Sequence, residues 1–216
     1  MKAPRIPIAQ EGYPFILFAG FSTLILAILE FAYAALPALA VTGFVLWFFR
    51  DPERVAPPHA DAFVSPADGK VIVAEKITDD RFMQGEVMKI SIFMNVFNVH
   101  VNRFPFGGEV KEITLRPGKF YSADTNKGAL HNEYCAITVT SKNNIKYCVV
   151  QVAGLIARRI VCWAEKGDSL ATGQRYGLIR FGSRVDLYLP AHFSTSVKKG
   201  DKVRAGETVL GYLGAA

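Results

Sequence analysis

The 216-residue sequence contains only three cysteines, Cys135, Cys148 and Cys162. Their number is odd, no two form a Cys-x-x-Cys pair, and their spacing does not suit zinc. The sequence therefore argues against both a disulfide framework and a metal centre. We interpret the three thiols as small apolar side chains of a protein in a reducing compartment.

The sequence also lacks the signatures of nucleic-acid binding. No segment resembles a basic recognition helix, a zinc finger or the aromatic strands of RNA-binding domains. The formal net charge is nevertheless +6, and the isoelectric point is near 9.2. A basic protein is attracted to acidic partners, so these features favour an anionic membrane surface over nucleic acid.

Polar residues are almost missing between residues 14 and 49. This 36-residue run is too long for one membrane-crossing helix, which needs about 20 residues. Glu30 interrupts it near the middle. The pattern predicts a hairpin of two short hydrophobic helices, near 14–29 and 34–49, with the turn around 30–33.

The flanks of this run predict its function as an anchor. The run is too long for a cleaved signal peptide and has no small-residue cleavage site. A hairpin returns to the side from which it entered, and Lys2, Arg5, Arg50 and Arg54 flank it. By the positive-inside rule we expect a cell-membrane protein in which the chain after the hairpin lies on the cytoplasmic side. A shallow re-entrant hairpin and a buried helical pair in a soluble core stay open as alternatives.

The composition changes abruptly at Arg50. Residues 50–63 are polar and rich in proline, as is typical of a linker. From Val64 onward, short β-rich runs alternate with Gly, Pro, Asp or Asn. The sequence thus predicts a membrane anchor at 1–49, a linker at 50–63 and a mostly β (α+β) domain, built from hairpins, at 64–216.

One internal repeat is present in the β-rich part. Residues 165–179 and 198–213 share the pattern K-G-D-x-x-x-x-G, 33 positions apart. The pattern predicts a Gly-Asp turn, a short strand, a second glycine turn and another strand. It resembles the barrel-sandwich hybrid of biotinyl and lipoyl carrier domains. Lys89 is the nearest match to a carrier lysine, but it lies in an apparent strand rather than a turn, so the resemblance is architectural.

Residues 177–190, GLIRFGSRVDLYLP, carry the strongest functional signal. Apolar strand sequence lies on both sides of Gly182-Ser183, and the segment resembles the processing site of short-form bacterial phosphatidylserine decarboxylases. Further matches to this family follow in the family's order: FFRDPER (48–54), SPADGKV (65–71), FNVHVNRFP (97–105), NEYCAITV (132–139) and GLIARRIV (154–161). Several weak motifs in one order form a strong joint signal.

The resemblance implies a self-processed enzyme. Ser183 would attack the Gly182 carbonyl, and β-elimination would divide the chain into 1–182 and 183–216. The serine then becomes a pyruvoyl group, a covalent cofactor that forms a Schiff base with the amine of phosphatidylserine and accepts the electrons released with CO2. Gly182 suits the attacked position because it has no side chain to obstruct a strained peptide.

A serine nucleophile needs a base, and the base usually needs a carboxylate. The resemblance assigns these roles to His100 and Asp68. Long-form relatives carry a second histidine in the motif, and Arg103 stands there instead, so the division between self-cleavage and later protonation stays open. His131 and His192 are alternative bases, whereas His59 is expected in solvent.

The sequence specifies the substrate-binding residues less closely than the catalytic residues. The candidates for binding the lipid phosphate and the substrate carboxylate are Arg103, His131 and Arg158, with Lys119, Lys127 and Arg159 as further cations. The predicted partner is phosphatidylserine in the membrane, and homo-oligomerisation is left open. The alternatives are decarboxylation of archaetidylserine and a non-enzymatic, membrane-tethered barrel-sandwich adaptor.

Overall fold

The fold is that of a computed structural model in which the chain forms two units, Met1–Glu53 and Arg54–Ala216. The two units are connected between Glu53 and Arg54. The structure describes residues 7–59, 61–155, 159–180 and 182–213.

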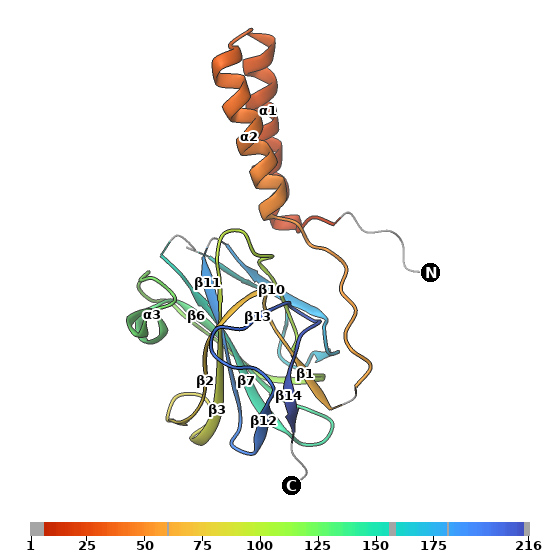
Figure 1. The fold of residues 1–216 in the computed structure, drawn as a ribbon, viewed down its shortest axis with the longest axis vertical. Coiled ribbons are helices and arrows are strands. Elements are labelled where there is room, and N and C mark those ends of the chain that lie inside the picture. The colour runs from red at the N-terminus through yellow and green to blue at the C-terminus, as the bar shows by residue number, and fades with distance from the viewer. Residues whose placement is uncertain (1–6, 60, 156–158, 181, 214–216) are drawn as a thin grey trace. The chain divides into compact units, whose positions relative to one another are not determined.

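The N-terminal unit is a pair of helices, α1 (Tyr13–Ile28) and α2 (Ala32–Phe48), preceded by the short 3-10 helix η1 (Gln10–Gly12) (Figure 1). Pro14 stands in the first turn of α1, where its missing N–H costs no hydrogen bond. Glu30 takes the left-handed conformation in the turn, with φ 57°. The predicted hydrophobic hairpin is confirmed.

Most large apolar side chains of the helical pair are exposed, Phe18 at 76% and Tyr33 at 99%. Helical residues Gln10–Ile28 form a segment that is long and apolar enough to cross a membrane, and Ala32–Phe48 is a shorter apolar helix. A helix that is apolar on every side is stable only when something covers it. By length and composition, α1 is therefore a candidate for membrane association.

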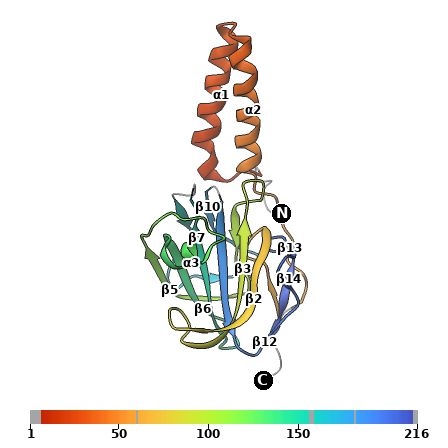
Figure 2. The ribbon, with the colours of Figure 1, turned by 60° about the vertical axis from the view of Figure 1, so that its left-hand side comes forward.

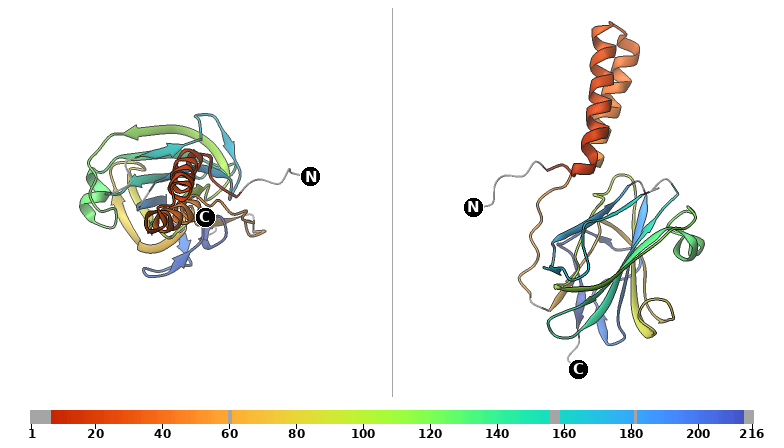
Figure 3. Two further views of the ribbon diagram at one scale, coloured as in Figure 1. Left: turned by 90° about the horizontal axis from the view of Figure 1, so that it is seen from above. Right: turned by 180° about the vertical axis from the view of Figure 1, so that it is seen from behind.

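The second unit is mostly β, as predicted. Its largest sheet has eight antiparallel strands in the order β13-β2-β3-β11-β7-β6-β5-β9, and it curls around the core (Figures 2 and 3). The strands of this sheet are β2 (Gly69–Asp79), β3 (Gly85–Met94), β5 (Gly108–Arg116), β6 (Tyr134–Thr140), β7 (Lys146–Ala153), β9 (Ser169–Leu170), β11 (Ser183–Pro190) and β13 (Lys202–Val203).

Two three-stranded sheets complete the β unit, in the orders β1-β14-β12 and β4-β10-β8. Their strands are β1 (Ala62–Val64), β4 (Val101–Arg103), β8 (Ile160–Cys162), β10 (Arg175–Ile179), β12 (Phe193–Thr195) and β14 (Val209–Leu213). One short helix, α3 (Asn126–His131), precedes β6, and the Thr125 hydroxyl accepts a hydrogen bond from the Gly128 N–H to cap it.

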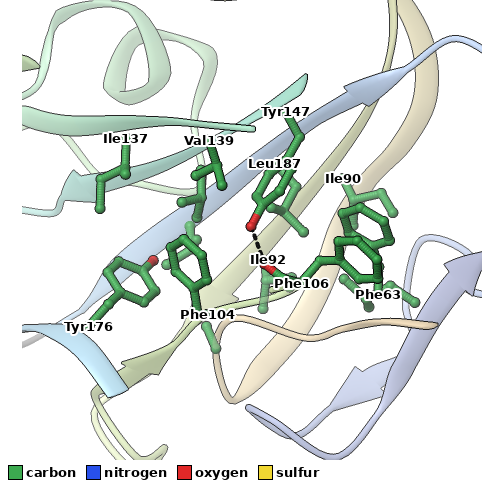
Figure 4. Packing of buried hydrophobic residues seen from close by; sticks show 14 of the residues in the cluster. Phe63, Ile90, Ile92, Phe104, Phe106, Ile137, Val139, Tyr147, Tyr176 and Leu187 are labelled. Carbon is green, nitrogen blue, oxygen red and sulfur yellow. Dashed lines mark hydrogen bonds between the residues drawn. The ribbon is translucent and has the colours of Figure 1, made fainter. Parts of the chain in front are cut away.

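The core lies inside the curled sheet and is rich in aromatic rings (Figure 4). Phe63 stacks on Phe106 with ring centroids 4.3 Å apart, and the Tyr147 hydroxyl donates a hydrogen bond to the Phe106 carbonyl. Each such ring buries about 150–250 Å² and supplies much of the driving force for folding. Burial also raises the pKa of Tyr147 well above its ordinary value, so the hydroxyl remains a donor.

Strand β11 runs through the centre of the large sheet, between β3 and β7. Its alternate residues Val185, Leu187 and Leu189 belong to the core, and this side is its core face. Arg184, Asp186 and Tyr188 point to the opposite side, its outer face. Side chains on both faces of β11 are buried. This burial explains why the sequence of the segment is typical of a strand along nearly its whole length.

The sequence repeat corresponds to two turns of the same geometry. Gly167 and Gly200 both have positive φ, and the aspartate after each accepts a hydrogen bond from the backbone N–H three residues earlier, at 2.9 Å in both cases. Each glycine N–H donates to a strand of the large sheet, to Val110 and to Val71 respectively, at 2.8 Å. The predicted Gly-Asp turns are therefore confirmed in both copies.

Candidate active site

Ser183 is the first residue of β11 and lies between Met94 of β3 and Ala153 of β7. The register places it on the core face, and its exposed fraction is 0%. Its Oγ atom has no hydrogen-bond partner in the described part of the chain. A buried hydroxyl without a partner costs about 1–3 kcal/mol, so such a group in a native fold calls for a functional explanation.

Gly182 immediately precedes this serine in the short connection from β10 to β11. Its φ of 63° lies in the left-handed region that favours glycine. Apart from its chain neighbours, no heavy atom of the described residues lies within 4 Å of the position that a Cβ would take there. The backbone conformation therefore favours glycine at 182.

His100 lies on the loop between β3 and β4 and is 1% exposed. Its carbonyl accepts a hydrogen bond from the Ile179 N–H at 3.3 Å, which holds it beside the end of β10, the strand that leads to Gly182. Its Nδ1 lies 2.9 Å from the Asn98 carbonyl. A carbonyl only accepts hydrogen bonds, so Nδ1 carries the proton and Nε2 is the basic nitrogen of the neutral ring.

The carboxylate of Asp68 is bound to groups other than His100. Its Oδ1 accepts a hydrogen bond from the Ala205 N–H at 2.7 Å, and its Oδ2 forms an ion pair with Arg54 at 3.1 Å. Arg54 is also paired with Glu207, at 2.7 Å. The role of Asp68 as the orienting partner of His100 stays a prediction.

Asp68 nevertheless lies at the same end of the large sheet as Ser183. Gly69, the next residue, packs so closely on β3 that a Cβ there would lie 2.1 Å from the Phe93 carbonyl oxygen. Phe93 in turn pairs with Arg184, next to Ser183. One strand thus separates the backbones of Asp68 and Ser183, a distance of about 10 Å at the usual strand spacing.

A buried amide pair near Ser183 was not anticipated from the sequence. Gln151 is fully buried on the core face of β7, and its Nε2 donates to Asn102 Oδ1 at 2.8 Å. Asn102 Nδ2 contacts Met94 Sδ at 3.6 Å, and Met94 is the cross-strand neighbour of Ser183. Gln151 Oε1 is without a partner among the described residues. The sequence feature that could have indicated this pair was Gln151, a single polar residue in the apolar run KYCVVQVAG.

The candidates for substrate binding lie in different environments. Arg103 is 3% exposed, and it donates a hydrogen bond to the Gly173 carbonyl at 3.1 Å, in a turn of the repeat. His131 is exposed at the end of α3, with its ring 6.3 Å from that of Tyr121. Arg158 lies outside the described residues. The assignment of all three stays a prediction.

Two open hollows, of about 490 and 360 Å³, lie near β5 and β9. Gly108, Lys142 and Ser169 line both, and none of the predicted site residues that the structure describes lines either. Within the described residues, no group of three or more His, Cys, Asp or Glu side chains could hold a metal ion.

A buried, unpaired serine hydroxyl behind a left-handed glycine, with a histidine on the neighbouring loop, fits the arrangement expected of a self-processing precursor. The family model for phosphatidylserine decarboxylase matches residues 41–211. The chain belongs to the phosphatidylserine decarboxylase family.

Three relatives illustrate this similarity, each named phosphatidylserine decarboxylase proenzyme. The relative from Desulfotalea psychrophila is 57% identical over 213 residues, and those from Geotalea uraniireducens and Pelobacter propionicus are each 50% identical, over 213 and 224 residues. Each alignment covers 99% of this chain and 100% of the relative.

Proposed function

We propose that this chain is the precursor of an enzyme that converts phosphatidylserine to phosphatidylethanolamine and CO2, with a pyruvoyl group made from Ser183. The observation that carries the proposal is the buried, unpaired Oγ of Ser183 next to a glycine with φ 63°. The names of its full-length relatives support both the reaction and the precursor state.

The self-cleavage uses groups of the chain itself. His100 Nε2 accepts the Ser183 hydroxyl proton, and Oγ attacks the Gly182 carbonyl carbon; the peptide C–N bond then breaks, leaving an ester and a free amine. Removal of the Ser183 Cα proton expels Gly182 as a carboxylate. The remaining dehydroalanine takes up water and releases ammonia, which leaves a pyruvoyl group at the start of chain 183–216.

The described residues around position 183 fit such a group. It would occupy the core face of β11, away from bulk water, between Met94 and Ala153. Its carbonyl supplies an electron sink for the bond to CO2. The polar ends of Gln151 and His100 lie on the elements that adjoin this position, and His100 is the proposed proton donor to the substrate.

We propose that the apolar helical pair holds the enzyme in the cell membrane. Support comes from the helical segment Gln10–Ile28, which is long and apolar enough to span a bilayer. The basic residues on both flanks favour a cytoplasmic position for the catalytic unit. An anchor of this kind suits a substrate that never leaves the bilayer.

The test is the intact mass of the purified protein. We expect two polypeptides, 1–182 and 183–216, the second beginning with a pyruvoyl group. Ser183→Ala should remain one chain without decarboxylase activity. Ser91→Ala is the matched control, because Ser91 is equally buried, lies on the neighbouring strand, and accepts its hydrogen bond from Arg184.

The control variant should still divide into two chains. An uncut but fully active Ser183→Ala protein would overturn the proposal. An uncut wild-type protein would instead favour the adaptor, although Lys89, the nearest match to a carrier lysine, lies in mid-strand and is ion-paired with Asp186 at 3.5 Å.

A further inference from the structure

Gly154 directly follows Ala153, the strand neighbour of Ser183, and lies against the peptide bond that self-cleavage would break. A Cβ at position 154 would lie 1.9 Å from the Gly182 carbonyl oxygen and 2.9 Å from the carbonyl carbon. The methyl group of Ala123 closes the same space from another side, at 3.5 Å. The attacked carbonyl therefore occupies the volume that any side chain at 154 would need.

Strand β7 is not free to move away from this contact. The Ala153 N–H donates to the Glu133 carbonyl at 2.9 Å, and the Ala153 carbonyl accepts from Asn132 Nδ2 at 2.7 Å. Asn132 is 3% exposed and also bonds both the N–H and the carbonyl of Tyr121, each at 2.7 Å. The backbone N–H and carbonyl of Ala153 are thus both held by the segment that leads into β6.

The other partner in the contact belongs to a short connection rather than to a strand. Its chain neighbours aside, no heavy atom of the described residues lies within 4 Å of the position that a Cβ at 182 would take. A methyl group at 154 would therefore displace the Gly182 carbonyl and leave β7 in place. Attack on a carbonyl requires near-contact geometry, and a misplacement of about 1 Å reduces such a rate by about 100-fold.

We propose that Gly154 is a positioning residue for self-cleavage, which holds the Gly182 carbonyl where Ser183 Oγ reaches it. This inference rests on the proposed function, since it concerns the bond that Ser183 attacks. Asn132 contributes by fixing the end of β7, so that the carbonyl is placed against a rigid surface. Neither residue exchanges protons or electrons with the reacting groups.

The test compares Gly154→Ala with a control of equal steric severity. Gly211 lies in β14 of another sheet, and a Cβ there would meet the Ser194 carbonyl oxygen at 2.1 Å. Full-length wild type, Gly154→Ala and Gly211→Ala are made by pulse-labelled cell-free synthesis, and the fraction cut at 182/183 is followed with time. Far-UV circular dichroism of each purified protein sets the temperature, so that all three are folded.

We expect Gly154→Ala to cut at least about 100-fold more slowly than wild type, and Gly211→Ala to cut at close to the wild-type rate although its melting temperature falls. If Gly154 had only a structural role, both variants would be cut more slowly, each in proportion to its loss of stability. A folded Gly154→Ala protein that cuts at the wild-type rate would overturn the inference.

Asn132→Ser provides a second variant should Gly154→Ala fail to fold. It keeps Gly154, adds no atoms and removes the bond to the Ala153 carbonyl, so cutting should slow by more than its loss of stability explains. Normal cutting of a folded Asn132→Ser protein would overturn the inference too. A wild-type protein that is never cut at 182/183 would sink the proposed function, whereas equal cutting of wild type and both variants removes only the role of Gly154 and Asn132.

Discussion

The two faces of β11 bury polar groups in different ways. On the outer face, Asp186 is bonded to Arg184 and lies 3.5 Å from Lys89, while Arg184 also donates to Ser91 Oγ at 2.9 Å. On the core face, the Ser183 hydroxyl has no partner in the described residues. The two residues that differ most in this respect, Ser183 and Arg184, are adjacent in the chain.

This difference separates polar groups that hold the fold from those available for chemistry. A buried charge is tolerated only when it is paired, and the outer-face cluster satisfies that condition. An unpaired buried hydroxyl weakens the fold, but its oxygen is not committed to any other contact. Substitution of a paired group should therefore lower stability and leave self-cleavage intact. Substitution of an unpaired group should impair self-cleavage without lowering stability.

Asp68 would be an exception to this distinction if it orients His100 as predicted. It is paired like a structural carboxylate, yet we expect Asp68→Asn to slow self-cleavage by about 100-fold or more, as in other constellations that lose the orienting acid. Asparagine keeps an acceptor for the Ala205 N–H, so the loop should persist. The measurement is the fraction of uncut precursor in the intact mass spectrum.

Arg54→Gln is the control for Asp68→Asn. Arg54 holds Oδ2 of Asp68 at 3.1 Å, so removing Arg54 frees this oxygen, and we expect cleavage to be at least as fast as in wild type. If both variants cut normally and lose similar stability, Asp68 serves only to hold Arg54 and the Ala205 N–H, and another group orients His100.

Asp186→Asn tests the paired set. Removing the carboxylate leaves Arg184 buried without its counter-charge and takes the partner from the partly exposed Lys89, and breaking a buried pair costs about 3–5 kcal/mol of unfolding free energy. Urea denaturation followed by circular dichroism measures the loss, and intact mass should still show two chains. Glu109→Gln is the control: its ion pair with Lys111 is 2.7 Å long but half-exposed, and such pairs contribute only about 0–1 kcal/mol. Equal losses in the two variants would contradict the distinction between the faces.

Patterns local in the sequence predicted the elements well. The apolar run between 14 and 49 gave two helices, because a hydrophobic segment longer than one bilayer span has to turn. The K-G-D repeat gave two matching turns, because Gly at positive φ and an Asp side chain bonding its own backbone are both local requirements. The prediction of a mostly β unit is confirmed too, because it also depended on local patterns.

Contacts between distant segments were beyond the reach of these patterns. Nothing in the sequence around Gly154 indicates that residue 182 lies against it, and Asn132 gives no sign that it bonds Tyr121 and Ala153. Asp68 could be placed in a turn, but its bond to Ala205, 137 residues away, depends on the pairing of β13 with β2. Ser183 could be singled out because its own segment carries the motif.

The smallest expected effect is a difference in reactivity between two cysteines. Cys148 is fully buried among the apolar residues that pack on the outer face of the large sheet, and burial raises the pKa of its thiol to about 12. Cys162 is half-buried in β8, and a hydrogen bond from the Cys135 thiol lowers the pKa of Cys162 although partial burial opposes the shift. The same contact, together with burial, raises the pKa of Cys135.

A thiol reacts with iodoacetamide as the thiolate, so a lowered pKa keeps it reactive at lower pH and a raised pKa makes it inert there. At pH 7, Cys162 should be labelled first, Cys135 and Cys148 only after unfolding in urea; peptide mass spectrometry gives the order. Cys162→Ser removes the early label and serves as the control. Labelling of Cys148 as fast as Cys162 in the folded protein would mean that the outer face of the large sheet opens readily, which would contradict its description as a closed, paired face.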